Sequence, residues 1–319
     1  MELIRGVHNL RPRHRGCVAT IGNFDGIHLG HQAIIRQVTD QARAHGLPAT
    51  VMVFEPQPRE FFAPEEAPAR LMTFREKVEI LAELGVDRVL CVKFDRRFCS
   101  QSAREFCDRI LVQGLGIRHL VVGDDFRFGN DRAGDFRFLQ TAGASQGFTV
   151  EHTHTYEWRG ERVSSTRVRE RLEQSDFATA EVMLGRPFFM SGRVIHGQKL
   201  GRSIGVPTAN LLPKRVQTPV TGVFAVEVQG LGPLQQGVAN LGTRPTLGGE
   251  QVRLEVHLLG FDGDIYGEHL RVLFRHKIRD EKKFDGLDAL TAAIHQDIAT
   301  AQAYFANNPA APASSLPRL

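Results

Sequence analysis

The chain has 319 residues, more than one hydrophobic core usually organises, so we expect two domains. Hydrophobic residues make up 42% and charged residues 24%, as in an ordinary globular protein, and the net charge of +4 suits anionic ligands without indicating nucleic acid. No apolar run reaches the roughly 18 residues of a membrane span, and residues 1–15 carry charges where a signal peptide is apolar. We therefore expect a cytoplasmic protein that binds neither membrane nor nucleic acid.

The first informative stretch is a glycine-rich turn at residues 22–31. It follows an apolar run at 18–21, and apolar residues at 34, 35, 38 and 42 then fit one helical face. Glycines let the backbone approach a ligand, and the start of a helix offers free N–H groups to a phosphate. His28 and His31 lie at that helix start, so both rings can face the same phosphate. An ordinary turn and a metal-binding histidine pair remain alternatives.

Strands and helices then alternate through the first half of the chain. The strands are expected at 49–54, 88–92, 119–122 and 148–151, and the helices at 74–84, 102–112 and 133–146. This alternation predicts an α/β domain, residues 1–184, with a parallel sheet. Ligands of such sheets bind beyond the carboxyl ends of the strands, so motifs that follow strands should converge. The four cysteines (Cys17, Cys91, Cys99 and Cys107) show no CxxC pattern, and we expect them to be reduced.

Composition changes near residues 183–187, where we place a domain boundary. Beyond it, short strands are expected at 188–195, 223–228, 236–240, 253–258 and 270–274, separated by Gly, Pro and Asp. This pattern predicts an antiparallel β-barrel domain, residues 187–306, closed by a helix at 287–304. Residues 307–319 are rich in Pro, Ala and Ser and should form a disordered tail.

Two polar features mark the second half. Residues 196–211 form a glycine-rich loop with basic residues, in which Thr208 and Asn210 supply neutral oxygens that can join phosphate oxygens around Mg²⁺. A plain barrel turn explains the glycines equally well. In the strand at 253–258, a period of two puts Leu254 and its alternate neighbours on the core face and Glu255 on the other face. A solvated polar face is the ordinary interpretation of that pattern.

Several of these segments carry a family resemblance. His28-Leu29-Gly30-His31 resembles the HxGH signature of the nucleotidylyltransferase superfamily, and the longer string from Gly22 resembles the bacterial bifunctional riboflavin kinase/FMN adenylyltransferases. Residues 123–129, 163–169, 196–211 and 255–267 are similar to further motifs of that family. The resemblance covers roughly residues 15–300, and it implies that the first domain has a nucleotidylyltransferase-like, Rossmann-like fold.

For the first domain the resemblance implies transfer of an adenylyl group from ATP to FMN, which yields FAD and pyrophosphate. The residues it assigns to catalysis are His28, His31 and Arg167. Those assigned to the nucleotide and its phosphates are Gly22, Asn23, Phe24, Asp25, Gly26, Gly30, Ser164, Ser165 and Thr166. Hydroxyls at a helix start also serve as ordinary N-caps, so a purely structural role for the last three remains open.

Four residues are assigned to the flavin: Phe62, Asp125, Phe126 and Phe128. The three aromatic rings could flank the isoalloxazine ring, although we expect at least one of them to pack into the core. Some family members carry Asn at the position of Asp125.

For the second domain the resemblance implies phosphorylation of riboflavin by MgATP, which yields FMN. Glu255 takes the position of the catalytic base, Thr208 and Asn210 hold Mg²⁺, and the phosphate loop contains Gly197, Gly201, Arg202 and Gly205. The expected partners are therefore flavins and ATP, with the protein a monomer or weak oligomer.

Two other classes of protein fit parts of this sequence. A chain of this kind could be a regulatory binding protein without turnover, but His28, His31, Arg167 and Glu255 are all present. A basic protein with a small barrel could also bind RNA. That would predict aromatic residues interleaved with Lys and Arg on the strands, whereas the expected strands are mainly aliphatic.

Overall fold

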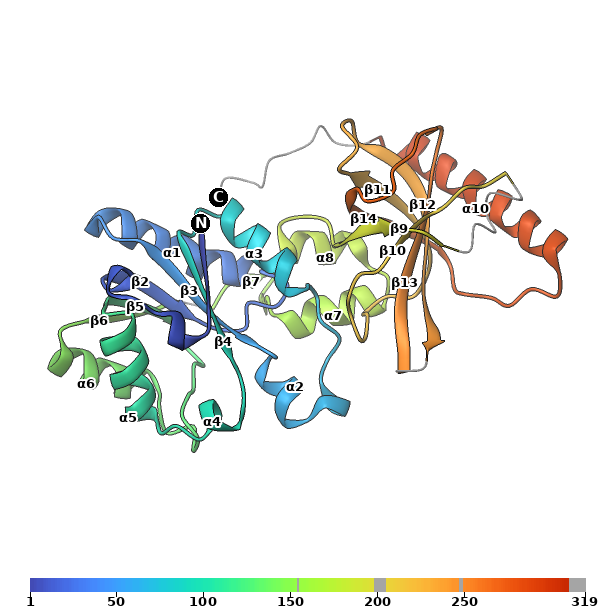
Figure 1. Ribbon diagram of the computed structural model, residues 1–319. Helices are drawn as coiled ribbons and strands as arrows, with labels where there is room; N and C mark the ends of the chain where they lie inside the picture. The colour runs from blue at the N-terminus through green and yellow to red at the C-terminus, as the bar shows by residue number, and fades with distance from the viewer. Residues whose placement is uncertain (154, 198–204, 247–248, 310–319) are drawn as a thin grey trace. The chain divides into compact units, whose positions relative to one another are not determined.

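The structure, a computed structural model, describes residues 1–153, 155–197, 205–246 and 249–309 (Figure 1). The chain divides into two compact units, residues 1–68 with 74–164 and residues 69–73 with 165–319. This division assigns the two short helices before residue 185 to the second unit, whereas the change in composition placed the boundary at 183–187. The domain boundary itself stays a prediction.

The first unit is built on a six-stranded parallel sheet in the order β1-β4-β3-β2-β5-β6. Its strands are β1 (Glu2–Arg5), β2 (Cys17–Ile21), β3 (Ala49–Glu55), β4 (Arg88–Lys93), β5 (Ile117–Gly123) and β6 (Thr149–Thr153). The predicted α/β fold with a parallel sheet is confirmed. The edge strand β1 was not predicted, because four residues are too few to establish a period of two.

Helices cover both faces of this sheet (Figure 1). The helices of this unit are α1 (Leu29–His45), α2 (Pro58–Phe62), α3 (Phe74–Glu83), α4 (Arg96–Cys99), α5 (Ala103–Phe106) and α6 (Phe136–Gln146). Helix α1 packs on one face of the sheet, and α5 and α6 pack on the other. The helix expected at 102–112 is instead α5 followed by a π-helical segment, Cys107–Gly114. Spacing of apolar residues does not separate the two forms, because both bury one side of the segment, here Ile110 and Leu111. A small hairpin, β7 (Glu157–Trp158) with β8 (Glu161–Arg162), completes the unit.

The alternation of side chains along β2 explains its continuous apolar run. Cys17, Ala19 and Ile21 face the core beneath the π-helical segment and α6, whereas Val18 packs against Val38 of α1 on the other face. A strand buried on both faces has no polar side, as expected for the centre of a parallel sheet. Burial also raises the pKa of the Cys17 thiol to about 11.

The strand order reverses beside β2. The sheet continues from β2 through β3, β4 and β1 in one direction, and through β5 and β6 in the other. The loops that follow β2 and β5 therefore leave the same edge of the sheet at the point where the order switches. In open parallel sheets this is the usual place for a ligand.

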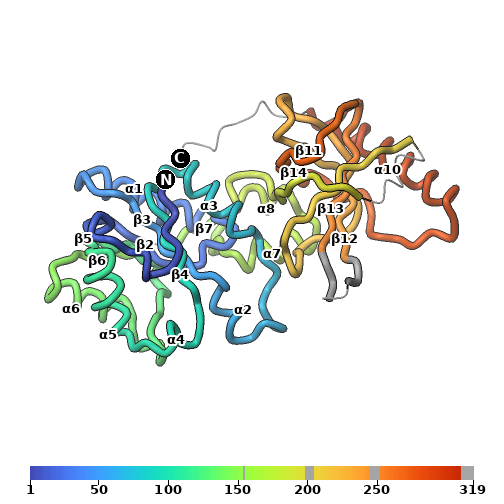
Figure 2. Tube along the Cα trace, in the orientation of Figure 1, coloured from blue at the N-terminus to red at the C-terminus, as the bar shows by residue number. Residues whose placement is uncertain are grey.

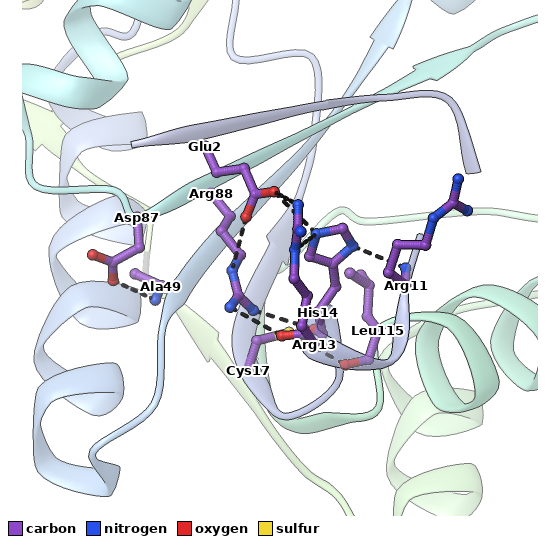
Figure 3. Close-up of polar contacts among 9 residues, drawn as sticks. All are labelled: Glu2, Arg11, Arg13, His14, Cys17, Ala49, Asp87, Arg88 and Leu115. Atoms are coloured by element: carbon purple, nitrogen blue, oxygen red, sulfur yellow. Dashed lines mark hydrogen bonds and ion pairs between the residues drawn. The ribbon is translucent and has the colours of Figure 1, made fainter. Parts of the chain in front are cut away.

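The opposite edge of the sheet is closed by an ionic cluster at the starts of the strands (Figure 3). The carboxylate of Glu2 accepts hydrogen bonds from Arg13 at 2.7 Å and from the buried ring of His14 at 3.1 Å. Arg88, at the start of β4, donates to the backbone carbonyls of Arg13 and His14 at 3.2 and 3.3 Å. The hydrogen bond from Arg13, followed by that from His14, lowers the pKa of Glu2. The cluster links the starts of β1 and β4 to the segment that precedes β2.

The second unit contains a closed antiparallel barrel in the order β10-β13-β12-β11-β14-β9, which confirms the predicted barrel. Its strands are β9 (Phe189–Ile195), β10 (Ala209–Leu211), β11 (Gly222–Gln229), β12 (Gln235–Thr246), β13 (Gly249–Leu258) and β14 (His269–Arg279). Strand β10 was not predicted, since three residues give no period.

Three helices accompany the barrel: α7 (Ser165–Glu173), α8 (Phe177–Leu184) and α10 (Leu287–Asn307). Phe177 of α8 packs edge-on against Phe224, with ring centroids 5.7 Å apart, so α8 shares the barrel core. Figure 2 shows α10 along the outside of the barrel, where Ala301 and Phe305 pack against Val223. The terminal helix predicted at 287–304 is confirmed, and the predicted tail lies outside the described residues from 310 onward. Over the described ranges, none of the helices is both long and apolar enough to cross a membrane.

Candidate active sites

The loop after β2 has an unusual backbone. Phe24, Gly26 and Ile27 adopt φ values of 47°, 82° and 39°. Non-glycine residues seldom take positive φ, so the loop is held in this shape by packing, and both Phe24 and Ile27 are almost fully buried. Of the remaining predicted nucleotide-binding residues here, Asn23 is exposed, whereas Asp25 and Gly26 are buried.

The two histidines lie together at the start of α1. His28 is the N-cap, and its Nδ1 accepts a hydrogen bond from the backbone N–H of His31 at 3.3 Å. An accepting Nδ1 carries no proton, so the proton of the His28 ring is on Nε2. The rings of His28 and His31 stack with centroids 3.7 Å apart, and Phe24 lies 5.1 Å from His31. Packing thus orients both imidazoles at a helix end that favours anions.

Glycines make this arrangement possible. A Cβ at Gly30 would lie 3.2 Å from the His28 ring and 3.5 Å from the carbonyl oxygen of Val163, and one at Gly22 would lie 3.1 Å from the Phe24 ring. Because Val163 immediately precedes Ser164, the predicted phosphate segment passes the first turn of α1 within the first unit.

That segment crosses from one compact unit into the other. Ser164 is the last residue of the first unit, and Ser165, Thr166 and Arg167 begin α7 in the second. Arg167 donates to Glu170 at 3.2 Å, one turn further along the same helix. The structure therefore describes His28, His31 and Ser164 in one unit and Arg167 in the other.

The loop after β5 is fastened to the β7–β8 hairpin. Thr155 donates to Asp124 at 2.7 Å, and Arg162 donates to Asp125 at 2.8 Å. The Thr155 hydrogen bond is the main cause that lowers the pKa of Asp124, with Arg162 adding to it. Asp125 is exposed, so its carboxylate is accessible beside a cationic side chain.

The aromatic residues expected at the flavin site belong to one continuous row of rings. Phe62 on α2 is 66% exposed and contacts Phe94, while Phe126 stacks on Phe128 at 5.4 Å. Phe126 and Phe128 are both partly buried and pack against the sheet core. The row is joined by consecutive ring contacts through Phe62, Phe94, Phe98, Phe106, Phe128 and Phe126. Sequence reasoning missed the linking rings because only contacts reveal them.

In the barrel, Glu255 stands in the middle of a polar row. It pairs with Asn210 of β10 on one side and with Asn240 of β12 on the other. Leu254 and Val256, its neighbours along β13, are fully buried, so the row lies on the face away from the core, as predicted. Directly opposed residues of antiparallel strands point to the same face, which places these three polar side chains side by side.

The segment before β10 approaches this row. The Asn210 carboxamide nitrogen donates to the Thr208 carbonyl at 3.3 Å, which leaves the carboxamide oxygen as the group's acceptor. Gly197 lies against Asn210 so closely that a Cβ would overlap the carboxamide, and Gly205 adopts a φ of 76°. The other two predicted loop residues, Gly201 and Arg202, lie outside the described residues.

Two polar residues of the row's surroundings were not predicted as site residues. Asn240 is exposed beside Glu255, and His257 Nδ1 lies 2.9 Å from the carbonyl oxygen of Pro207. The period of two already put His257 on the polar face of β13, but its contact and the position of Asn240 depend on strand register.

Family models match both halves of the chain. The FAD synthetase model matches residues 10–167, and the riboflavin kinase model matches residues 184–305. The first match covers most of the parallel sheet, and the second covers the barrel.

Relatives and a solved structure are similar over nearly the whole length. The chain is 57% identical over 307 residues to the bifunctional riboflavin kinase/FMN adenylyltransferase of Pseudomonas fluorescens, covering 96% of this chain and 98% of the relative. It is 53% identical over 308 residues to the protein of that name from Escherichia coli K12, with the same coverage. A crystal structure titled as a macrolide-efflux protein from Streptococcus pneumoniae shares 29% identity and a TM-score of 0.78, covering 95% of this chain and 99% of that one. The chain therefore belongs to the bacterial family of bifunctional riboflavin kinase/FMN adenylyltransferases.

Proposed function

We propose that the two activities of this enzyme are divided between its two sets of polar residues. The enzyme phosphorylates riboflavin with ATP to give FMN, and it adenylylates FMN with ATP to give FAD. The proposed division assigns the first reaction to the row around Glu255 and the second to the loop that holds His28 and His31. The observation that carries it is that Glu255 lies in one compact unit and the pair His28 and His31 in the other.

In the kinase reaction, Glu255 acts as the general base. It takes the proton of the terminal ribityl hydroxyl while the hydroxyl oxygen attacks the γ-phosphorus of ATP. The new oxygen–phosphorus bond forms as the bond to the departing ADP breaks. A half-buried carboxylate flanked by Asn210 and Asn240 supports this role, because strand pairing fixes its backbone on both sides. A positioned base contributes about 10²–10⁴-fold.

Thr208 and Asn210 would hold the Mg²⁺ that accompanies ATP. The donor set fits, because the Asn210 carboxamide nitrogen is engaged by the Thr208 carbonyl and its oxygen remains as an acceptor. Mg²⁺ needs few protein ligands, since phosphate oxygens and water supply the others. When bound, it neutralises phosphate charge. Gly197 and Gly205, with Gly201 and Arg202, would complete the phosphate loop.

In the adenylyl transfer, no protein nucleophile is required. A phosphate oxygen of FMN attacks the α-phosphorus of ATP, and pyrophosphate leaves. Nε2 of His28 and the ring of His31 would donate to the transferring phosphate at the positive end of α1. The Ser164–Thr166 hydroxyls and Arg167 would hold the departing phosphates, because a guanidinium binds phosphate in a bidentate manner.

The remaining proposed contacts concern the flavin and the nucleotide. Exposed Phe62 and half-buried Phe126 would contact the isoalloxazine ring, with Phe128 behind Phe126 and Asp125 at the rim. Buried Phe24, Asp25 and Gly26 would act through the loop backbone. We also propose a cytoplasmic enzyme that acts as a monomer or weak oligomer without nucleic acid.

Purified enzyme and its Glu255→Gln and His28→Ala variants can test the division. Each protein is incubated with MgATP and either riboflavin or FMN, and the flavins are separated by chromatography. The proposal requires that Glu255→Gln loses only the conversion of riboflavin to FMN. It requires that His28→Ala loses only the conversion of FMN to FAD. Loss of both activities in either folded variant would refute the division.

A further inference from the structure

We propose that His257 is a positioning residue of the kinase centre that fixes the segment leading into β10, and with it Thr208. The inference rests on the proposed roles of Glu255, Thr208 and Asn210. It adds a residue that does not touch the substrate but holds Thr208 in place.

Strand pairing holds β10 only from Ala209 onward. Asn210 pairs with Glu255 and Ala209 with Val256, and Ala209 is the first paired residue of β10. Pro207 has no N–H and cannot extend the ladder by donating to β13. The chain immediately before the proposed Mg²⁺ ligands therefore needs another attachment.

The side chain of His257 supplies that attachment. Its Nδ1 lies 2.9 Å from the carbonyl oxygen of Pro207. A carbonyl only accepts hydrogen bonds, so Nδ1 carries the proton and donates. Because His257 lies two residues after Glu255 on the same face of β13, one strand presents the base and also holds the segment that carries Thr208.

On the other side of Pro207, Val206 is buried and anchors the segment by packing. Packing of the Val206 side chain fixes how far the segment lies from the core. A directed hydrogen bond to the Pro207 carbonyl also fixes the orientation of the peptide plane. The peptide plane between Pro207 and Thr208 contains that carbonyl, so its orientation determines where Thr208 points. Loss of the hydrogen bond should therefore weaken binding of the nucleotide's phosphates more than binding of riboflavin.

Three substitutions separate this role from general support of the fold. His257→Ala removes the donor, His257→Gln places its amide nitrogen near the position of Nε2, and His257→Asn places it near that of Nδ1. We expect the affinity for MgADP, measured by calorimetry, and the KM for MgATP to worsen about tenfold in the Ala and Gln variants, as for loss of a support to a metal ligand. The Asn variant should bind MgADP nearly as wild type does, and the KM for riboflavin should change little in all three.

Two controls accompany the series. FAD formation from added FMN should be unchanged in every variant, and His295→Ala, which alters an exposed histidine on α10, should leave MgADP affinity unchanged. Unchanged MgADP affinity in the Ala and Gln variants would overturn the inference. So would an Asn variant as weak as Ala, or a KM for riboflavin that rises as much as that for MgATP.

Failure of the proposed function would look different. If Glu255→Gln keeps full kinase activity, the assignment of the row itself is wrong, whatever the His257 series gives. If Glu255→Gln abolishes FMN formation while the His257 variants bind MgADP normally, only the positioning role is refuted.

Discussion

The two candidate sites hold their polar groups by different means. In the sheet unit, His28 and His31 extend from a loop and a helix start, and their orientation depends on a backbone with Phe24 and Ile27 at positive φ. In the barrel unit, Glu255 lies within a strand, and its neighbours Asn210 and Asn240 are set by the pairing of β10, β13 and β12. One site is thus defined by local loop geometry and the other by strand register.

This difference decides which substitutions each site should tolerate. A loop site depends on a few glycines and buried side chains that are close together in the sequence. A strand site depends on pairing between segments that are distant in the sequence. Removing Glu255 or one of the two histidines should then abolish one reaction and leave the other, because these groups lie in different units.

The largest effect is expected for Glu255→Gln. The amide cannot accept the ribityl proton, so FMN formation should fall by about 10²–10⁴-fold. FAD formation from added FMN should stay near the wild-type rate, since an FMN phosphate is already anionic. Steady-state rates for the two substrates check this. Wild-type kinase activity in this variant would remove the base from the strand site.

Next in size is the loss at the loop site. His28→Ala or His31→Ala should lower FAD formation by about 10²–10³-fold, comparable with loss of one preorganised donor to a transition state. FMN formation from riboflavin should continue, and it accumulates as the end product. If both variants make FAD at the wild-type rate, the two imidazoles do not stabilise the transferring phosphate.

A smaller effect tests whether α8 belongs with the barrel. Phe177→Leu loses ring contacts with Phe224 and Phe274, and we expect it to destabilise the second unit by about 1–2 kcal/mol. After stepped heating, kinase activity should disappear at a lower temperature than in the wild type. Adenylyltransferase activity should fall less, because His28, His31 and Ser164 lie in the first unit.

Val182→Ala is the matched control, because that side chain on α8 is 42% exposed. Equal losses of both activities in Phe177→Leu would mean that α8 supports the whole chain rather than the barrel.

The smallest effect is a pH dependence confined to the sheet unit. Burial lowers the pKa of His119, and nearby Glu151 opposes the shift only in part. In the unfolded chain His119 has its ordinary pKa of 6.5, whereas in the folded chain its pKa is lower. The contribution of His119 to stability is therefore complete above pH 6.5 and falls as the pH drops below that value. His119→Asn should flatten the dependence of Tm on pH between about pH 8 and pH 5. A variant with the wild-type slope would assign the dependence to another group.

Sequence alone predicted the sheet, the barrel and the face on which Glu255 lies, because each follows from a periodic pattern. It missed β1 and β10, which are too short to show a period, and it read α5 and the π-helical segment as one helix. The loop motif at residues 22–31 could be recognised because its parts are adjacent in the chain.

The surroundings of Glu255 could not be predicted in the same way. Asn210 and Asn240 reach it only through strand register, and the contact between His257 and Pro207 joins residues that no local pattern relates. Periodicity gives the face of a strand, but it does not say which residue of another strand lies opposite.

The central claim is that the two sites work independently, and mixing two defective enzymes tests it most directly. His28→Ala should make FMN but very little FAD, and Glu255→Gln should make FAD readily only from added FMN. Mixed with riboflavin and MgATP, the two proteins should together form FAD, because FMN released by one is the substrate of the other. A mixture that forms no FAD, although each variant keeps its own remaining activity, would contradict independent sites.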